Sequence, residues 1–133
     1  MIASFALSGC TSMSTKVDKG RHLAAVRHFF VLSNLNDNHA IDESIVRALQ
    51  ARGFQAESGP STMIPDTAQA LVTYEDRWAW DFSNHMVHLR ISAQEPQAFQ
   101  PYASAVYHKN VALSTEVDVV VDQLVGELLK SAK

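Results

Sequence analysis

The sequence is poor in the features that mark several protein classes. Its 133 residues contain one cysteine, Cys10, and this excludes an intramolecular disulfide framework. No apolar run reaches the roughly 18 residues that a membrane-spanning helix requires. Lysine and arginine number 11 against 14 aspartates and glutamates, and this lack of a basic surplus argues against a nucleic-acid partner.

Sequence motifs of catalysis and cofactor binding are also missing. The chain has no glycine-rich phosphate loop, HExxH, CxxC or GxSxG. Two of its six histidines, His85 and His88, are three residues apart, a spacing that places them on opposite faces of a strand. A zinc site would also need a third ligand, which the sequence does not supply. We therefore expect no metal, no cofactor and no enzymatic activity.

Apolar residues, by contrast, make up 47% of the chain, and their periodicity predicts the element order β-α-β-β-β-β-α. Gly53 is expected to end the first helix in a left-handed conformation. A strand–helix–strand connection is right-handed, which makes the first two strands parallel. The predicted fold is α+β, a two-layer sandwich of a mixed β-sheet with two helices on one face. The expected strands cover residues 25–32, 54–58, 71–82, 87–93 and 103–109, with helices from Ile41 and from Thr115.

The turn between the third and fourth strands decides which polar side chains meet. A four-residue turn, Ser83–Met86, pairs Phe82 with Val87 and keeps the apolar residues of both strands on one face. This register places Asp81 opposite His88. A two-residue turn would set two arginines against each other, and their charges would repel, so we predict the longer turn.

The same hairpin carries a possible interaction surface. An Asp–His pair can orient a general base, but an exposed sheet face commonly carries such pairs as a solvated ladder or as part of a partner surface, which we favour. Aromatic residues at period two are most simply core residues, although a tryptophan near the strand end could instead border a groove for a peptide or glycan. The candidate residues are Trp78, Trp80, Asp81, His88 and Arg90.

The lone cysteine ends the sequence Leu7-Ser8-Gly9-Cys10, which resembles the lipobox of bacterial lipoproteins, an aliphatic residue and two small residues before cysteine. The resemblance implies cleavage before Cys10, a diacylglycerol on its sulfur and a further acyl chain, such as palmitate, on the new amino terminus. Because Thr11 rather than an aspartate follows, it also implies the outer membrane on the periplasmic side, with the inner membrane as the alternative.

The segment before the box is short for a signal peptide. No basic residue precedes Lys16, so either most of the signal is missing or the box is a coincidence in a cytosolic protein. We expect residues 1–9 to be a truncated signal peptide and residues 10–23 a lipidated cysteine with a flexible tether. Residues 24–133 are expected to form a single globular domain.

Four segments of the globular part carry a second resemblance: Leu49–Phe54, Ala70–Tyr74, Trp78–Asp81 and Leu89–Ile91. They resemble the small uncharacterised lipoproteins of proteobacteria. More distantly, the element order of the globular part is similar to that of lipoproteins that assist curli secretion or activate penicillin-binding proteins. The resemblance implies a lipid-anchored periplasmic accessory or scaffold that contacts another envelope protein. The alternatives are a periplasmic ligand-binding or hydrolytic protein that uses the face of Asp81 and His88, and a soluble cytosolic domain.

Overall fold

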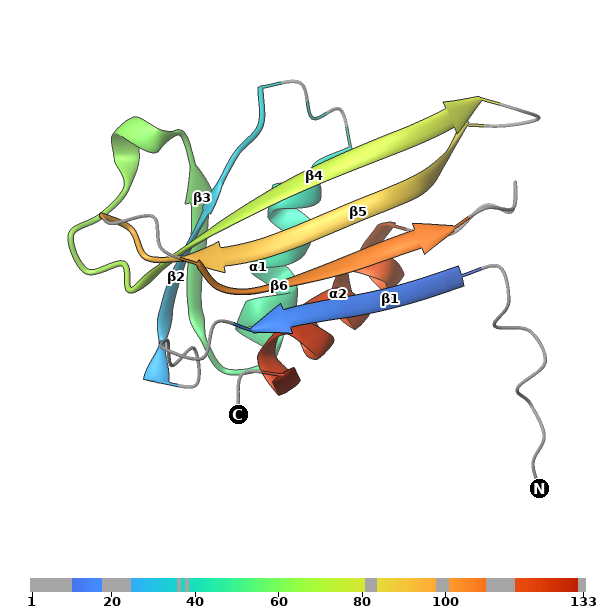
Figure 1. The fold of residues 1–133 in the computed structure, drawn as a ribbon. Coiled ribbons are helices and arrows are strands. Elements are labelled where there is room, and N and C mark those ends of the chain that lie inside the picture. Colours follow the sequence, from blue (N-terminus) through green and yellow to red (C-terminus); the bar gives the residue numbers. More distant parts are fainter. Residues whose placement is uncertain are drawn as a thin grey trace.

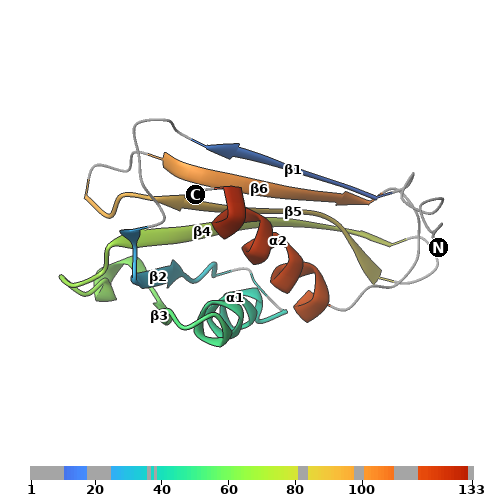
Figure 2. The ribbon, with the colours of Figure 1, turned by 90° about the horizontal axis from the view of Figure 1, so that it is seen from below.

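A mixed six-stranded sheet with two helices on one face forms the framework of the protein (Figures 1 and 2). The structure, a computed structural model, describes residues 11–17, 25–35, 37, 39–80, 84–97, 101–109 and 117–131. The spatial order of the strands is β1-β6-β5-β4-β2-β3. The elements are β1 (Thr11–Val17), β2 (His28–Leu32), α1 (Ile41–Ala51), β3 (Gln55–Gly59), the 3₁₀ turn η3 (Ser61–Met63), β4 (Ala70–Trp80), β5 (Asn84–Gln94), β6 (Pro101–Lys109) and α2 (Val117–Ser131).

The predicted α+β fold class is confirmed, and from β2 onward the elements follow the predicted order. β2 is parallel to both β3 and β4, as the right-handed crossover through α1 requires for β3. The pairs β4–β5, β5–β6 and β1–β6 are antiparallel. Figure 2 shows α1 and α2 side by side on the same face of the sheet, and neither of these described helices covers the other face.

The core lies between the helices and the sheet. From α1 it takes Ile45 and Leu49, and from α2 it takes Leu124 and Leu128, all of which are almost fully buried. Each such side chain contributes roughly 1.5–3 kcal/mol through its removal from water. The apolar residues of the two helices recur at helical spacing, which explains why sequence periodicity predicts both helices.

The expected tether is wrong in its first half. Thr11–Val17 forms the edge strand β1, paired in full with β6 from Thr11–Lys109 to Val17–Ala103. The reason is an alternation within this segment: Met13, Thr15 and Val17 occupy the register positions of buried β6 residues, while the residues between them are polar. Pairing with β1 also satisfies the backbone groups along one side of β6. Cys10, residues 1–9 and residues 18–24 lie outside the described part of the chain.

The predicted register of the β4–β5 hairpin is also wrong. Arg77 lies opposite His88, and the register then shifts by one so that Trp78 lies opposite Met86. Val87 is left without a paired residue, which is the pattern of a β-bulge. His88 is therefore paired with an arginine and not with Asp81, a residue outside the described part of the chain.

The bulge has a physical cause in the sequence of β5. Met86 and Leu89 are three residues apart, and a regular strand would place them on opposite faces of the sheet. Both side chains are buried, at 2% and 0% exposure. One extra residue in β5 brings them to the same face, so the burial of Met86 compensates for the irregular hydrogen bonding.

A hydrogen-bonded turn starts α1. Asp37 accepts hydrogen bonds from the backbone N–H groups of His39, at 2.8 Å, and of Ile41, at 2.9 Å. These bonds supply a partner to one of the first N–H groups of the helix. At the other end Gly53 has a φ of 88°, which confirms the expected left-handed residue after α1.

Candidate interaction surface

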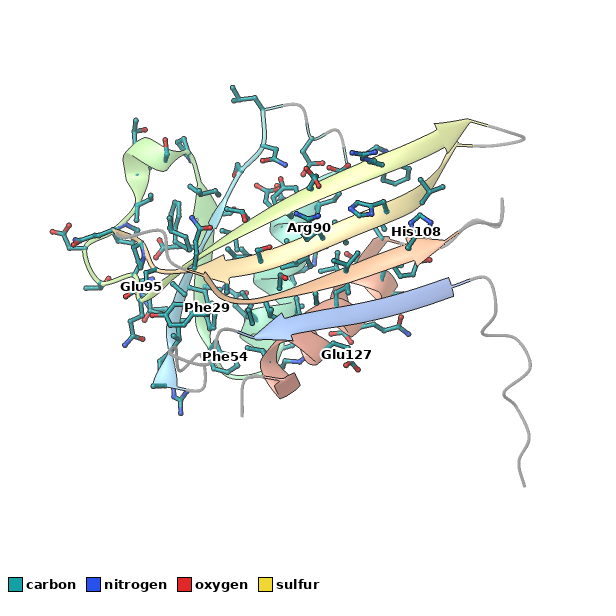
Figure 3. The ribbon with its side chains drawn as sticks, in the orientation of Figure 1. Phe29, Phe54, Arg90, Glu95, His108 and Glu127 are labelled. Atoms are coloured by element: carbon teal, nitrogen blue, oxygen red, sulfur yellow. The ribbon has the colours of Figure 1, made fainter. Side chains whose placement is uncertain are left out.

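The sheet face opposite the helices carries a row of charged and titratable side chains, which we call the open face: Glu75, Arg77, His88, Arg90 and His108. Arg90 alternates along β5 with the buried residues Leu89 and Ile91, so it belongs to this face. Arg90 and His108 lie on it in Figure 3. Glu75, Arg77, Arg90 and His108 are exposed, and His88 is half-buried.

The open face is a cross-strand ladder. Glu75 lies opposite Arg90, Arg77 lies opposite His88, and His88 in turn lies opposite His108. The Nε2 atom of His88 is 3.9 Å from Oε1 of Glu75, and its ring centroid is 6.2 Å from that of His108 in an edge-to-face arrangement. Opposite charges in such positions stabilise a sheet by roughly 0.2–1 kcal/mol per pair.

Electrostatics keep the centre of this ladder neutral. Burial lowers the pKa of His88 below its usual 6.5, and interactions with the neighbouring Arg77, Arg90 and His108 lower it further. Glu75 acts in the opposite direction but does not offset them. At neutral pH the open face therefore carries two arginines and one glutamate around an uncharged imidazole.

The five residues predicted to form one surface lie at different places in the structure. His88 and Arg90 share the open face. Trp78 lies on the helix side of the sheet, where it is half-buried and packs against the core. Its ring stacks on His39 with centroids 3.7 Å apart and an interplanar angle of 12°, and its Nε1 donates a hydrogen bond to Asp76.

The remaining two candidates lie at the end of the hairpin. Trp80 is the last residue of β4 and pairs with Asn84, the first residue of β5. Asp81 lies outside the described residues. The predicted surface is thus three separate features: the open face, the Trp78 stack on the helix side, and the hairpin end.

A polar network at the carboxyl end of β2 was not predicted. Tyr74 donates a 2.7 Å hydrogen bond from its hydroxyl to Asp37, and the same hydroxyl accepts one from the backbone of Asn34 at 3.2 Å. Asn34 also donates from its side chain to the carbonyl oxygen of Tyr74, and Ser33 donates to Asp42. The sequence did contain an indication of this network: Tyr74 was expected on the core face of a strand, where its hydroxyl needs a hydrogen-bond partner.

The network shifts two pKa values. Burial raises the pKa of Tyr74 far above its usual 10.0, and the neighbouring Asp37 raises it further. Burial alone would raise the pKa of Asp37, but hydrogen bonds from Tyr74 and from the backbone outweigh it and lower that pKa below 3.8. At neutral pH the Tyr74 hydroxyl is therefore the hydrogen-bond donor and the Asp37 carboxylate the acceptor. The same hydrogen bonds hold the loop after β2, in which the side chain of Leu35 is fully exposed to solvent.

A shallow hollow of about 480 Å³ lies at the other end of β4. It is formed by the segment after η3 and the turn after β5, which meet there. The residues that line it are Ile64, Pro65, Asp66, Ala68, Glu95, Pro96 and Gln97.

No cluster of three or more histidine, cysteine or acidic residues that could hold a metal ion occurs among the described residues. None of the described helices is long and apolar enough to cross a membrane.

Comparison with known proteins shows similarity of fold alone. No family model matches the sequence, and no curated protein matches it. PelC from Paraburkholderia phytofirmans, solved as a dodecamer, has a TM-score of 0.63 at 14% identity, covering 92% of this chain and 96% of its own. A single-substitution variant of that PelC, also a dodecamer, has a TM-score of 0.60 at 14% identity, covering 90% of this chain and 97% of its own.

A PDZ domain protein from Parabacteroides distasonis is similar over part of its length. Its TM-score is 0.54 at 11% identity, and the match covers 87% of this chain and 34% of that one. This chain therefore has the fold of PelC over nearly its full length and of a segment of a larger protein. At such low identity the likeness extends to the arrangement of strands and helices and to no individual residue.

Proposed function

We propose that the protein is a lipid-anchored component of the bacterial cell envelope, acylated on Cys10, that acts as an accessory or scaffold through protein–protein contacts. The sequence Leu7-Ser8-Gly9-Cys10 carries this proposal. Small residues before the cleaved bond suit a narrow protease site, and the thiol is the only strong nucleophile there to take a diacylglycerol. Thr11 after the cysteine favours the outer membrane, with the domain in the periplasm.

Several acyl chains on one residue make the attachment stable. Each methylene that enters the membrane contributes about 0.8 kcal/mol, so one chain holds a protein only reversibly, whereas two or more hold it firmly. Such an anchor restricts a small domain to one surface of the envelope and so favours contact with other proteins on that surface.

Two features of the fold support protein–protein contact. The open face is a sheet surface that neither described helix covers, and its exposed Arg77 and Arg90 can pair with carboxylates of a partner. β1 is an edge strand, which has backbone groups on its outer side for pairing with another chain. The assembly of PelC as a dodecamer supports contact between copies as one form of this function.

The anchor is tested by labelling in cells. The gene, kept at its own locus, is compared with the variant Cys10→Ser in cells fed an alkyne analogue of palmitate. The original protein is expected to take up label and to sediment with membranes, whereas the variant takes up none and is released. Equal labelling of both proteins, or of neither, would refute the acylation.

The contact surface is tested by photo-crosslinking in the envelope. A photoreactive residue replaces Arg90 on the open face, and a matched control replaces Gln50, which is exposed on α1. Position 90 is expected to give a discrete crosslinked product with a second copy or another envelope protein, and position 50 none. No product from position 90, or the same products from both positions, would contradict a partner on the open face.

A further inference from the structure

We propose that the open face binds a short acidic segment of another envelope protein, whose carboxylates pair with Arg77 and Arg90. This inference rests on the proposed role in protein–protein contact and adds the chemistry of the partner. Two further residues of the face, Glu75 and His88, set how strongly such a segment is held. These four residues, which we call the square, come from the neighbouring strands β4 and β5.

The square places the two arginines on one diagonal. Glu75 lies opposite Arg90, Arg77 lies opposite His88, and the two residues of each strand are two positions apart. Diagonal neighbours on a sheet are about 7–8 Å apart, which is within reach of long side chains. On the other diagonal, Oε1 of Glu75 is 3.9 Å from Nε2 of His88. The glutamate of the square therefore approaches the histidine and forms no ion pair with either arginine.

The arginines of the square differ in their ion pairing from those on the helix side. Arg47 in α1 and Arg52 directly after it pair with aspartates of α2, at 2.9 and 2.8 Å. In the part of the chain that the structure describes, neither Arg77 nor Arg90 forms an ion pair, and both are exposed. The open face thus presents two guanidinium groups that can take carboxylates from outside the domain.

The surroundings of the square do not reverse its charge. Along β1 the residues in register with the open face are Ser12, Ser14 and Lys16, which add one base and no acid. Asp76 alternates with the residues of the face and lies on the helix side. Asp81 follows β4, outside the described residues, and is counted here as one acid. The balance at neutral pH is one net positive charge, in a chain whose overall charge is −3.

The size of the patch favours a short segment over a whole domain. From Thr73 to Arg77 the face is about 13 Å long, at about 3.3 Å per residue. From β4 to β6 it is about 10 Å wide, at about 4.8 Å per strand spacing. A standard protein–protein interface needs about 800 Å² on each partner, which is more than this patch offers.

An acidic segment also matches the spacing of the arginines. Carboxylates two positions apart on an extended chain are about 6.6 Å apart, close to the diagonal of the square. Arginine clusters commonly recognise acidic motifs, because the planar guanidinium group can hold a carboxylate through two hydrogen bonds. Beside the square the side chains are short, since the half-buried Thr73, Ser92 and Ser104 lie opposite one another in the next row. A chain can therefore approach the arginines closely.

Glu75 is an internal competitor for the two arginines, and His88 modulates it. Burial, together with Arg77, Arg90 and His108, lowers the pKa of His88, although Glu75 acts in the opposite direction, so the imidazole is uncharged at neutral pH. When the pH falls, the imidazole gains a proton and pairs with Glu75, which then repels an incoming carboxylate less. Binding should therefore strengthen on acidification, until the carboxylates of the segment take up protons near about pH 4.3.

The test uses the full chain with Cys10→Ser, so that neither acylation nor a disulfide between copies takes part. The probe is a rhodamine-labelled peptide in which glutamate and serine alternate, and the control peptide has glutamine in place of every glutamate. Binding is followed by fluorescence anisotropy at low ionic strength, because salt screens exposed charges. Arg77→Gln and Arg90→Gln are each expected to weaken binding at least about fivefold. Arg47→Gln, the matched loss of one charge on α1, should change it less than about twofold.

Two variants test the other diagonal of the square. Glu75→Gln is expected to strengthen binding about threefold at neutral pH, because the competing carboxylate is removed. The original chain is expected to bind about threefold more tightly near pH 5.5 than near pH 7.5, and His88→Gln should lose most of this gain. A purely structural role of these residues in the sheet predicts neither change.

Several results would overturn the proposal: equal binding of the two peptides, equal losses in Arg47→Gln and the arginine variants of the square, or no gain in Glu75→Gln. Two further arms examine other occupants. Vesicles of phosphatidylglycerol that displace the peptide would assign the face to a lipid surface, and self-association that Arg90→Gln removes would assign it to a second copy. Either result would also refute an acidic partner. A crosslink from position 90 without binding of the acidic peptide would refute this inference alone and leave the proposed contact function standing.

Discussion

Removing the hydroxyl of Tyr74 is expected to destabilise the protein strongly for so small a change. Tyr74 is 6% exposed, and its hydroxyl donates a 2.7 Å hydrogen bond to Asp37, the residue that binds the first turn of α1. A hydrogen bond to a charged group contributes about 1.5–3 kcal/mol, and the backbone N–H of Asn34 loses its acceptor as well. We expect Tyr74→Phe to lower the free energy of unfolding by about 2–3 kcal/mol at pH 7.

The assay is urea unfolding followed by tryptophan emission, because Trp78 lies near this network. Tyr102→Phe is the matched control: its hydroxyl donates a longer, exposed hydrogen bond of 3.3 Å to the carbonyl oxygen of Gln69. That variant should lose less than about 1 kcal/mol. Equal losses in the two variants, or no loss in Tyr74→Phe, would refute the assignment of a structural role to the network.

The pH dependence of the same variant provides a second check. The folded state lowers the pKa of Asp37, so its contribution to stability is present above the unfolded value near 3.8. The contribution is lost as the pH falls through the lower pKa of the folded state. The difference between the original protein and Tyr74→Phe should therefore shrink below about pH 4. A difference that grows on acidification would contradict this linkage.

Three further substitutions test the fold. Leu124→Ala should cost about 2–5 kcal/mol in urea unfolding, because the side chain is fully buried between α2 and the sheet; a cost below about 1 kcal/mol would argue against this packing. Gly53→Ala should cost about 1 kcal/mol, because the φ of 88° is unfavourable for any residue with a Cβ; a gain in the melting temperature would contradict that conformation. Thr15→Pro should remove protection from hydrogen exchange at the alternate amides of Ala103–Lys109 that face β1, while those bonded to β5 stay protected and Thr62→Pro in the exposed η3 turn changes neither set; intact protection of the β1-facing amides in Thr15→Pro would show that β1 does not pair there.

Sequence patterns predict the parts of this fold that depend on local periodicity. The helix α1 (Ile41–Ala51) has a regular apolar stripe and is followed by a left-handed glycine at position 53, as its sequence predicts. The parallel pairing of β2 with β3 follows from the handedness of the connection. These features depend on residues close together in the chain, where spacing alone carries the information.

The features that the sequence did not predict depend on distant partners. The alternation in Thr11–Val17 is visible in the sequence, but the polar residues of this segment also suit a tether. The segment forms a strand because it pairs with β6, and the sequence of the segment alone does not reveal that partner. The bulge at Val87 depends on whether Met86 is buried, which the packing of the helix side decides. The contact of Tyr74 with Asp37 joins residues 37 positions apart.

The most direct test of the central claim is the intact mass of the protein isolated from membranes. The account predicts a chain that begins at Cys10 and carries the added mass of a diacylglycerol and one further acyl chain, with no free thiol. A chain that retains residues 1–9 and an unmodified Cys10 thiol would contradict it.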